Sequence, residues 1–161
     1  MYTLYGNLHS LRILVVDDKE TWADLIKSDI QITLECHVHI VTDLNSAMHK
    51  VVQWKPHIIF LDIHIPLGDW KPVPKLQTKY DLTQQSFAFC EQVVSSRKLP
   101  NTILIMMSVD NQEQYIALAK KAGARHYFDK SENFVEFFEG ILKRYSLNVE
   151  RCNQRTDSQQ F

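Results

Sequence analysis

The sequence predicts an α/β fold, a five-stranded parallel sheet that is doubly wound, with helices on both of its faces. Two observations carry this prediction. Short apolar runs rich in β-branched residues alternate along the chain with stretches in which apolar residues recur every three or four positions, the spacing of one helix face. The apolar runs are nearly continuous, as expected of parallel strands that are covered on both sides.

The first strand and helix are predicted within residues 11–30. The run 11–16 is rich in β-branched residues and is followed by Asp17 and Asp18. Apolar residues at helical spacing follow it, which indicates a helix with one buried face. That stripe consists of Trp22, Leu25, Ile26 and Ile30.

The second strand is predicted over residues 38–41, and a second helix follows it. Thr42 or Asp43 can cap the start of this helix, and Pro56 marks its end. Its apolar stripe consists of Leu44, Ala47, Met48, Val51 and Val52.

The third strand covers residues 58–61 and is closed by Asp62. A helix is predicted around residues 86–97, and Asp81 with Gln84 resembles a capping box before it. Its apolar side consists of Phe87, Cys90 and Val94. We expect Cys90 to be a core residue rather than a reactive thiol.

The fourth strand covers residues 102–107 and ends at Ser108. Asp110 with Glu113 is a second candidate capping box, and Gly123 stands where a helix C-terminal cap belongs. The helix between them has the stripe Tyr115, Leu118, Ala119 and Ala122.

The fifth strand covers residues 125–128 and is followed by Lys130. Ser131 can cap the last helix. The stripe of that helix is aromatic and predicts core packing; it consists of Phe134, Phe137, Phe138 and Ile141.

One segment does not fit the alternation of strands and helices. The 46 positions from Asp62 to Ser108 exceed the roughly 30 that a loop, a helix, a loop and a strand need. We therefore expect an insertion of about 16 residues within 67–82, lying over the strand ends as a lid or forming a partner surface. Trp70 in this insertion either packs on the domain or serves as a contact anchor.

The composition is that of an ordinary globular domain. The chain has 161 residues, 45% hydrophobic and 23% charged, with a formal net charge of -1, so it has no overall attraction to nucleic acid or anionic membranes. We expect one domain over residues 1–147 and a polar C-terminal tail or linker over 148–161. Residues 1–10 lack the layout of a signal peptide, no apolar run could cross a bilayer, and three cysteines without a CxxC pair signal no disulfide framework. A soluble cytoplasmic protein is therefore expected.

Polar residues stand where four of the five strands end. They are Asp17 and Asp18, Asp62, Ser108 and Lys130. Ligands of open parallel sheets bind at the carboxyl ends of the strands. Three carboxylates gathered there repel one another, and a hard divalent cation such as Mg²⁺ relieves that repulsion. A lysine and a hydroxyl beside the metal suit a phosphoryl group, and a carboxylate can accept one.

These strand-end residues occur in a wider pattern. Pro66 follows Asp62 by four positions, and Tyr127 precedes Lys130 by three. An Ala-Gly-Ala turn occupies residues 122–124. Over most of the chain the pattern resembles the receiver domain of two-component response regulators, which implies a flavodoxin-like fold.

The resemblance implies a role for each acidic residue. Asp62 would accept a phosphoryl group from a sensor histidine kinase or phosphotransfer protein in a phosphorelay. Asp17, Asp18, Asp62 and the backbone carbonyl of His64 would hold Mg²⁺. Because the chain would catalyse only its own phosphorylation and dephosphorylation, it is expected to be a signalling protein rather than an enzyme.

The resemblance also implies a switch. Ser108 and Lys130 would bind phosphoryl oxygens, and Ser108 with Tyr127 would move together when Asp62 is phosphorylated. That movement would repack the face formed by the helix before Gly123, the strand 125–128 and the last helix. A downstream protein would read this face, and a homodimer through it is compatible with the resemblance; no direct contact with nucleic acid or membrane is expected.

Two positions depart from the family pattern, and the insertion is the largest departure. Ser131 stands where receivers usually have proline, so we expect a looser loop and a less firmly placed Lys130. Val109 replaces a small residue and should narrow access to Asp62. His64 and Asp110 occupy the two positions that tune hydrolysis in the family.

Two alternatives to a phosphorylated receiver stay open. One is a receiver-like interaction or dimerisation module that is never phosphorylated. The other is a phosphatase-type enzyme using Asp62, although such enzymes need a second carboxylate two positions on, where His64 stands. The chain has no GxxxxGK[ST], GxGxxG or GxSxG motif for other classes, and His37 and His39 alone do not make a metal site.

Overall fold

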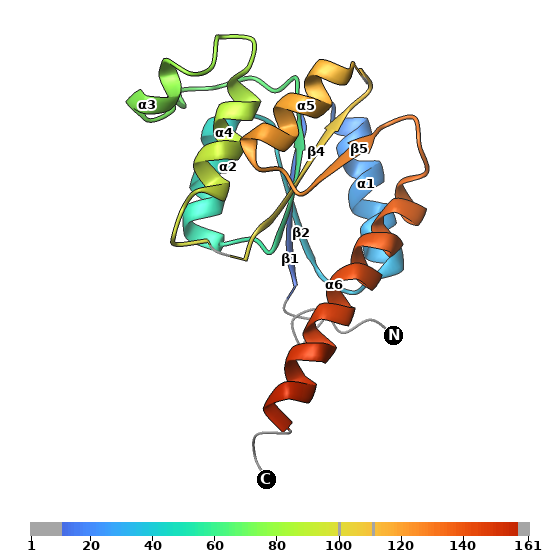
Figure 1. Ribbon diagram of the computed structural model, residues 1–161. Coiled ribbons are helices and arrows are strands. Elements are labelled where there is room, and N and C mark those ends of the chain that lie inside the picture. The colour runs from blue at the N-terminus through green and yellow to red at the C-terminus, as the bar shows by residue number, and fades with distance from the viewer. Residues whose placement is uncertain (1–10, 100, 111, 158–161) are drawn as a thin grey trace.

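A computed structural model describes residues 11–99, 101–110 and 112–157, with side chains to residue 145. Five strands form one parallel sheet in the order β2-β1-β3-β4-β5 (Figure 1). Their bounds are Arg12–Val16 for β1, His37–Val41 for β2, Ile58–Asp62 for β3, Ile103–Ser108 for β4 and His126–Asp129 for β5. The predicted fold class is confirmed, whereas the prediction for residues 1–10 falls outside the described residues.

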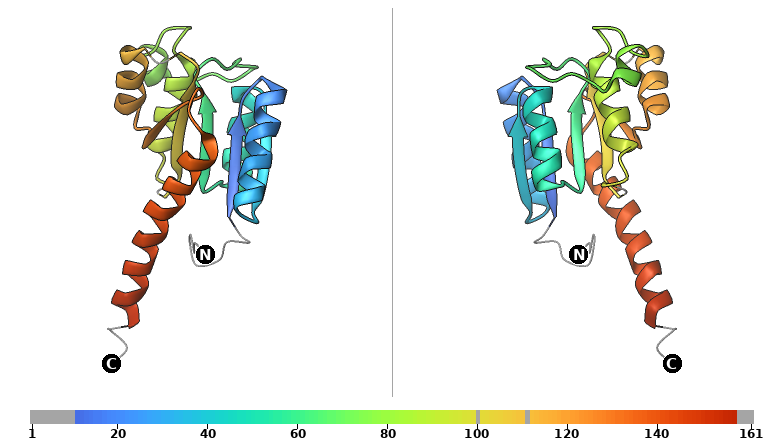
Figure 2. Two further views of the ribbon diagram at one scale, coloured as in Figure 1. Left: turned by 90° about the vertical axis from the view of Figure 1, so that its right-hand side faces the viewer. Right: turned by 90° about the vertical axis from the view of Figure 1, so that its left-hand side faces the viewer.

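Helices cover both faces of the sheet, as Figures 1 and 2 show. Their bounds are Glu20–Thr33 for α1, Leu44–Trp54 for α2, Pro74–Gln77 for α3, Gln85–Val94 for α4, Glu113–Ala122 for α5 and Phe134–Asp157 for α6. α1 and α6 pack on one face, and α2, α4 and α5 on the other. Because both faces are covered, all four residues 13–16 of β1 are fully buried.

The core lies in two layers, one on each side of the sheet. On the α1 and α6 side, Phe60 packs edge-on against Phe134 at 5.3 Å and Phe138 at 6.3 Å between ring centroids. The other layer is centred on Phe87 and Phe89 of α4 and contains Cys90, which is fully buried. Burial raises the pKa of the Cys90 thiol to about 12, which agrees with a packing role.

Helix starts agree only in part with the sequence-based prediction. Asp43 caps α2 as predicted, because its Oδ1 accepts a hydrogen bond from the Ser46 amide at 2.7 Å. Before α4, the Gln84 side chain accepts from the Asp81 amide at 3.3 Å, as in a capping box. The Asp81 carboxylate, however, accepts from Thr83 in the preceding turn, and Gln84 is itself the cap position.

Two other predicted caps are wrong. α5 starts after Gln112, and the Asp110 carboxylate accepts from the Gln112 side chain instead of from a helix amide. At α6, Asn133 Oδ1 accepts from the Glu136 amide at 3.0 Å, whereas Ser131 bonds Asp129. Each true start lies about two residues after the predicted one, because a short turn first uses the polar side chain locally.

Three residues predicted on apolar stripes are exposed. They are Leu25, Val52 and Val94. Each stands next to a residue that faces the sheet, and neighbours along a helix are rotated by about 100° about its axis. The adjacent residues Ile26, Val51 and Val93 are the ones that enter the core.

The insertion folds against the domain beside α4 (Figure 1). It contains the short helix α3, and its residues Trp70, Leu76 and Tyr80 are buried in the core layer of α4. Trp70 packs edge-on against Phe89 with ring centroids 5.5 Å apart. Of the two roles predicted for Trp70, packing on the domain is therefore the one observed.

The last helix is longer than expected. α6 runs through Asp157 and projects past the end of the sheet where the strands begin (Figure 2). Residues 148–157, expected to be an irregular tail, are helical, while a domain boundary at residue 147 stays a prediction. Within the described part of the chain, every helix is too short or too polar to span a lipid bilayer.

Candidate functional site

Strand order brings the predicted site residues to one edge of the sheet. β1 lies beside β3 with Val16 opposite Leu61, so Asp17 and Asp62 emerge next to each other at the carboxyl ends. β4 lies on the other side of β3 and ends at Ser108, and β5 beyond it leads into Lys130. The geometry of a parallel sheet therefore assembles residues that are far apart in the chain.

Lys130 joins the two inner carboxylates. Its Nζ lies 2.7 Å from Asp17 Oδ2 and 3.1 Å from Asp62 Oδ2. All three side chains are buried, with exposed fractions of 3% for Lys130, 0% for Asp17 and 5% for Asp62. Charges taken out of water are tolerated only when they are paired and hydrogen-bonded, and this arrangement meets that condition.

The second oxygen of each inner carboxylate is fixed by the backbone. Asp17 Oδ1 accepts from the Lys19 amide at 2.9 Å, and Asp62 Oδ1 accepts from the His64 amide at 3.2 Å. Each carboxylate is thus held between an amide two residues on and the Lys130 ammonium. This arrangement fixes the orientation of both carboxylates.

Burial raises the pKa of Asp62, and the nearby Asp17 carboxylate raises it further, against the opposing effect of the Lys130 ammonium. The net direction is upward. Asp62 is therefore a carboxylate whose negative charge is incompletely balanced, which favours binding of additional positive charge at this edge.

Asp18 supplies the outer carboxylate of the cluster. Oxygen atoms of Asp17, Asp18 and Asp62 all lie within 4.8 Å of one another. Asp18 is exposed and borders a cavity of about 530 Å³, together with His64. Carboxylate oxygens gathered on a solvent-accessible edge are ligands that suit a hard divalent cation, so the three residues fit the predicted metal site.

The predicted switch residues are both tied to the backbone of Asp110. Ser108 is fully buried, and its Oγ accepts from the Asp110 amide at 2.9 Å. The Tyr127 hydroxyl donates to the Asp110 carbonyl at 3.0 Å, and burial raises the pKa of Tyr127. Asp110 thus links the two residues through its peptide groups, which no sequence motif indicated.

The loop after Lys130 is held by several hydrogen bonds. The Ser131 amide and hydroxyl both donate to Asp129 Oδ1, at 2.8 and 2.7 Å. The Lys130 amide donates to the Ser108 carbonyl at 2.9 Å. Ser131 therefore supplies local bonds that a proline could not make, and the looser placement of Lys130 stays a prediction.

Trp22 is a site residue that the sequence pattern assigned to the core alone. Lys130 Nζ lies 5.3 Å from the centroid of the Trp22 ring, within the range of a cation–π contact. The indole Nε1 is buried and has no hydrogen-bond partner among the described residues. Trp22 lies in the first turn of α1, just after Asp18. That position was the sequence signal that could have placed Trp22 near the strand ends.

Comparisons with known proteins bear on the fold. No protein-family model matches the chain, and no curated protein matches it. Among solved structures, a CheY-like response regulator receiver domain protein from Methanospirillum hungatei JF-1 is similar with a TM-score of 0.68 and 20% identity, covering 88% of this chain and 98% of that chain.

Two further structures agree. Chemotaxis protein CheY4 of Vibrio cholerae has a TM-score of 0.65 and 18% identity over 84% of this chain and 98% of its own. The Mn²⁺-bound form of response regulator Rcp1 has a TM-score of 0.60 and 18% identity over 83% of this chain and 90% of its own. The chain therefore has the CheY-like, flavodoxin-like fold of a response regulator receiver domain.

Proposed function

We propose that this chain is a response regulator receiver that accepts a phosphoryl group on Asp62. The donor is a phosphohistidine of a sensor histidine kinase or phosphotransfer protein. A carboxylate oxygen of Asp62 forms the new bond to phosphorus as the phosphorus–nitrogen bond of the donor breaks, and the imidazole leaves with a proton. Hydrolysis of the resulting acyl phosphate later restores Asp62.

The observation that carries this proposal is the buried contact of Lys130 with both Asp17 and Asp62. A lysine that already lies beside the acceptor oxygen can pair with the incoming phosphoryl oxygens without a large movement. Positioned positive charge of this kind stabilises the charge that develops during phosphoryl transfer. Ser108, at the end of the adjacent strand, would donate its hydroxyl to another phosphoryl oxygen.

The acidic cluster supports a metal requirement. Asp17, Asp18, Asp62 and the backbone carbonyl of His64 would hold Mg²⁺, which supplies positive charge against the phosphoryl oxygens when bound. Asp18 is suited to this role because it is exposed beside the cavity. The negative charges of Asp17 and Asp62, which contact Lys130, would then be balanced by the lysine and the metal together.

The hydrogen bonds of Asp110 support a switch at Ser108 and Tyr127. If the Ser108 hydroxyl turns to a phosphoryl oxygen, it gives up the bond from the Asp110 amide, and the same residue holds the Tyr127 hydroxyl. Movement of this loop would repack the face of α5, β5 and α6, which a downstream protein or a second copy would read. The chain is then a signalling protein rather than an enzyme, and its cytoplasmic location stays a prediction.

The test is the intact mass of the chain after incubation with acetyl phosphate and Mg²⁺. We expect one added phosphoryl group, lost on treatment with hydroxylamine because the adduct is an acyl phosphate. Asp62→Asn should remove the addition, while Asp69→Asn, a matched change of an exposed carboxylate in the insertion, should retain it. Replacing Mg²⁺ by a chelator should suppress the reaction in the parent chain.

Three outcomes would contradict phosphorylation of Asp62. If neither acetyl phosphate nor beryllofluoride modifies or binds the parent chain, the site is not a phosphoryl acceptor and the alternative of a contact or dimerisation module holds. Turnover of a small phosphate ester would instead indicate a phosphatase. Addition that persists in Asp62→Asn would place the acceptor elsewhere.

A further inference from the structure

Three aromatic rings connect the loop after β3 with α5 and α4. The His64 imidazole lies edge-on to the Tyr115 ring, with centroids 5.8 Å apart and ring planes at 86°, a favourable arrangement for two aromatic rings. Tyr115 also stacks on Phe87, with centroids 6.3 Å apart and planes at 20°. Phe87 is fully buried in the core layer of α4. Tyr115 is therefore held by the closely packed core and cannot move freely with the loop.

The loop is anchored to the domain on either side of His64. The Ile63 amide donates to a carbonyl of β4 at 3.0 Å, and the Pro66 carbonyl accepts from the first amide of α2 at 2.9 Å. Between these anchors His64 is exposed, and its amide donates to Asp62 Oδ1 at 3.2 Å, the long end of the range for such bonds. A long bond from an exposed residue fixes the backbone only weakly, so the contact of the His64 side chain gains importance for the orientation of its peptide groups.

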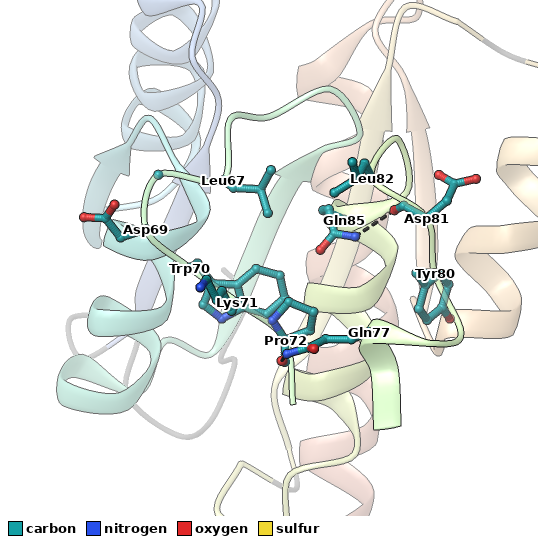
Figure 3. Close-up of a pocket in the computed structure, with 11 residues that line it drawn as sticks. Leu67, Asp69, Trp70, Lys71, Pro72, Gln77, Tyr80, Asp81, Leu82 and Gln85 are labelled. Atoms are coloured by element: carbon teal, nitrogen blue, oxygen red, sulfur yellow. Dashed lines mark hydrogen bonds between the residues drawn. The ribbon is translucent and has the colours of Figure 1, made fainter. Parts of the chain in front are cut away.

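The pair of His64 and Tyr115 borders the cavity beside the carboxylate cluster. Both residues line this cavity, together with Asp18 and the two ends of the insertion. Figure 3 shows Leu67 and Leu82, which belong to those ends and also line a separate pocket within the insertion. A cation that enters beside the exposed Asp18 would therefore meet a wall to which Tyr115 contributes.

We propose that Tyr115 is a positioning residue for the divalent cation and acts through His64. The edge-on contact restricts the His64 side chain, and a restricted side chain limits the backbone angles of its residue. The carbonyl of that residue would then already face the cation before binding. The inference rests on the proposed function for the place of the His64 carbonyl among the ligands, but it does not require that Asp62 be phosphorylated.

The first test measures cation affinity directly, with Mn²⁺ as the probe and the EPR signal of free Mn²⁺ as the readout. Mn²⁺ prefers the same oxygen ligands as Mg²⁺. Tyr115→Leu removes the ring, and we expect it to weaken Mn²⁺ binding about three- to tenfold, the range of one aromatic pair. Tyr115→Phe keeps the ring and should bind Mn²⁺ as the parent chain does. Unchanged affinity in Tyr115→Leu, or an equal loss in Tyr115→Phe, would overturn the proposal.

The chain offers a matched control and a double-mutant cycle. Tyr145 lies edge-on to His126 with the same centroid distance of 5.8 Å, so Tyr145→Leu removes an equivalent pair and should leave Mn²⁺ affinity unchanged. His64→Ala removes an exposed imidazole but keeps the backbone carbonyl, and it should weaken binding by the same factor as Tyr115→Leu. In the His64→Ala background, Tyr115→Leu should then add no further loss. A full additional loss, or a loss in Tyr145→Leu, would show that Tyr115 does not act through His64.

Failure of this inference is distinguishable from failure of the proposed function. If Tyr115→Leu weakens Mn²⁺ binding in a chain that acetyl phosphate does not modify, Tyr115 has the positioning role and Asp62 is not an acceptor. If the parent is phosphorylated and Tyr115→Leu binds Mn²⁺ as the parent does, the role of Tyr115 alone is overturned. A parent chain that binds no Mn²⁺ would contradict both.

Discussion

The ammonium of Lys130 lies over the indole of Trp22, with Nζ 5.3 Å from the ring centroid. The lysine is thus bounded by two carboxylates on one side and an aromatic face on another. An aromatic face attracts a cation without neutralising it. Trp22 therefore confines Lys130 while leaving its charge available to the Asp62 carboxylate.

Replacing Trp22 separates the contribution of its ring face from that of its N–H group. Trp22→Phe keeps an aromatic face and removes the buried N–H, which has no partner among the described residues, so we expect little change in the free energy of unfolding. Trp22→Leu removes the face and should cost about 1–2 kcal/mol. Urea unfolding checks both, and equal losses in the two variants would show that the ring face contributes nothing.

Lys130 should stabilise the fold most strongly when no divalent cation is present. Lys130→Met leaves Asp17 and Asp62 buried without their counter-charge, which we expect to cost about 3–5 kcal/mol in the presence of a chelator. Saturating Mg²⁺ should recover part of this loss. Thermal unfolding of the parent and the variant, with and without Mg²⁺, measures this loss of stability. Lys79→Met, at an exposed ion pair, is the control. If Mg²⁺ does not change the loss in Lys130→Met, the lysine and the cation do not balance the same carboxylates.

Asp62→Asn should stabilise the fold at neutral pH by about 1–2 kcal/mol. The folded-state pKa of Asp62 is raised, first by burial, so the buried carboxylate destabilises the parent chain above that pKa. As the pH falls through the raised pKa toward the ordinary value of 3.8, the parent becomes protonated and the advantage of the variant disappears. Unfolding free energies of both chains across this range give the result, and an advantage that grows toward low pH would have the wrong sign.

Two glycines offer a matched test of backbone conformation. Gly123 ends α5 with φ 97°, and a Cβ there would lie 2.8 Å from Val94 Cγ1. Gly123→Ala should therefore cost at least about 1–2 kcal/mol. Gly140 lies within α6 and has open space where a methyl group would be added, so Gly140→Ala should raise the free energy of unfolding by about 0.5–1 kcal/mol. Chemical denaturation that shows the same sign for both would exclude this account.

The sheet and the location of the site were predictable because they depend on strong local signals. Nearly continuous apolar runs indicated β1, β3 and β4, the βα alternation placed β2 and β5, and Gly123 marked the end of α5 correctly. Because the carboxyl ends of parallel strands share one edge of the sheet, the sequence alone predicted that Asp17, Asp62 and Lys130 lie close together. These features follow from burial and from the topology of parallel sheets, which tolerate few alternatives.

Other features depend on the choice between competing local hydrogen bonds, which spacing does not reveal. Asp110 and Ser131 had the residue types of helix caps, yet both engage neighbours in the preceding turn. Trp22 matched a core stripe so well that its contact with Lys130 was not foreseen. The anchoring of the insertion likewise required knowledge of which surface Trp70 and Tyr80 would meet.

The separation of the site residues along the chain has a consequence during protein synthesis. Lys130 follows Asp62 by 68 positions, so at about 5–20 residues per second it is added roughly 3–14 s later. Until then, β1 and β3 can pair only by bringing two carboxylates together without their lysine. If the cluster binds a divalent cation as proposed, a growing chain gains from that cation before it can gain from Lys130. The cation concentration would then influence how early β1 and β3 pair.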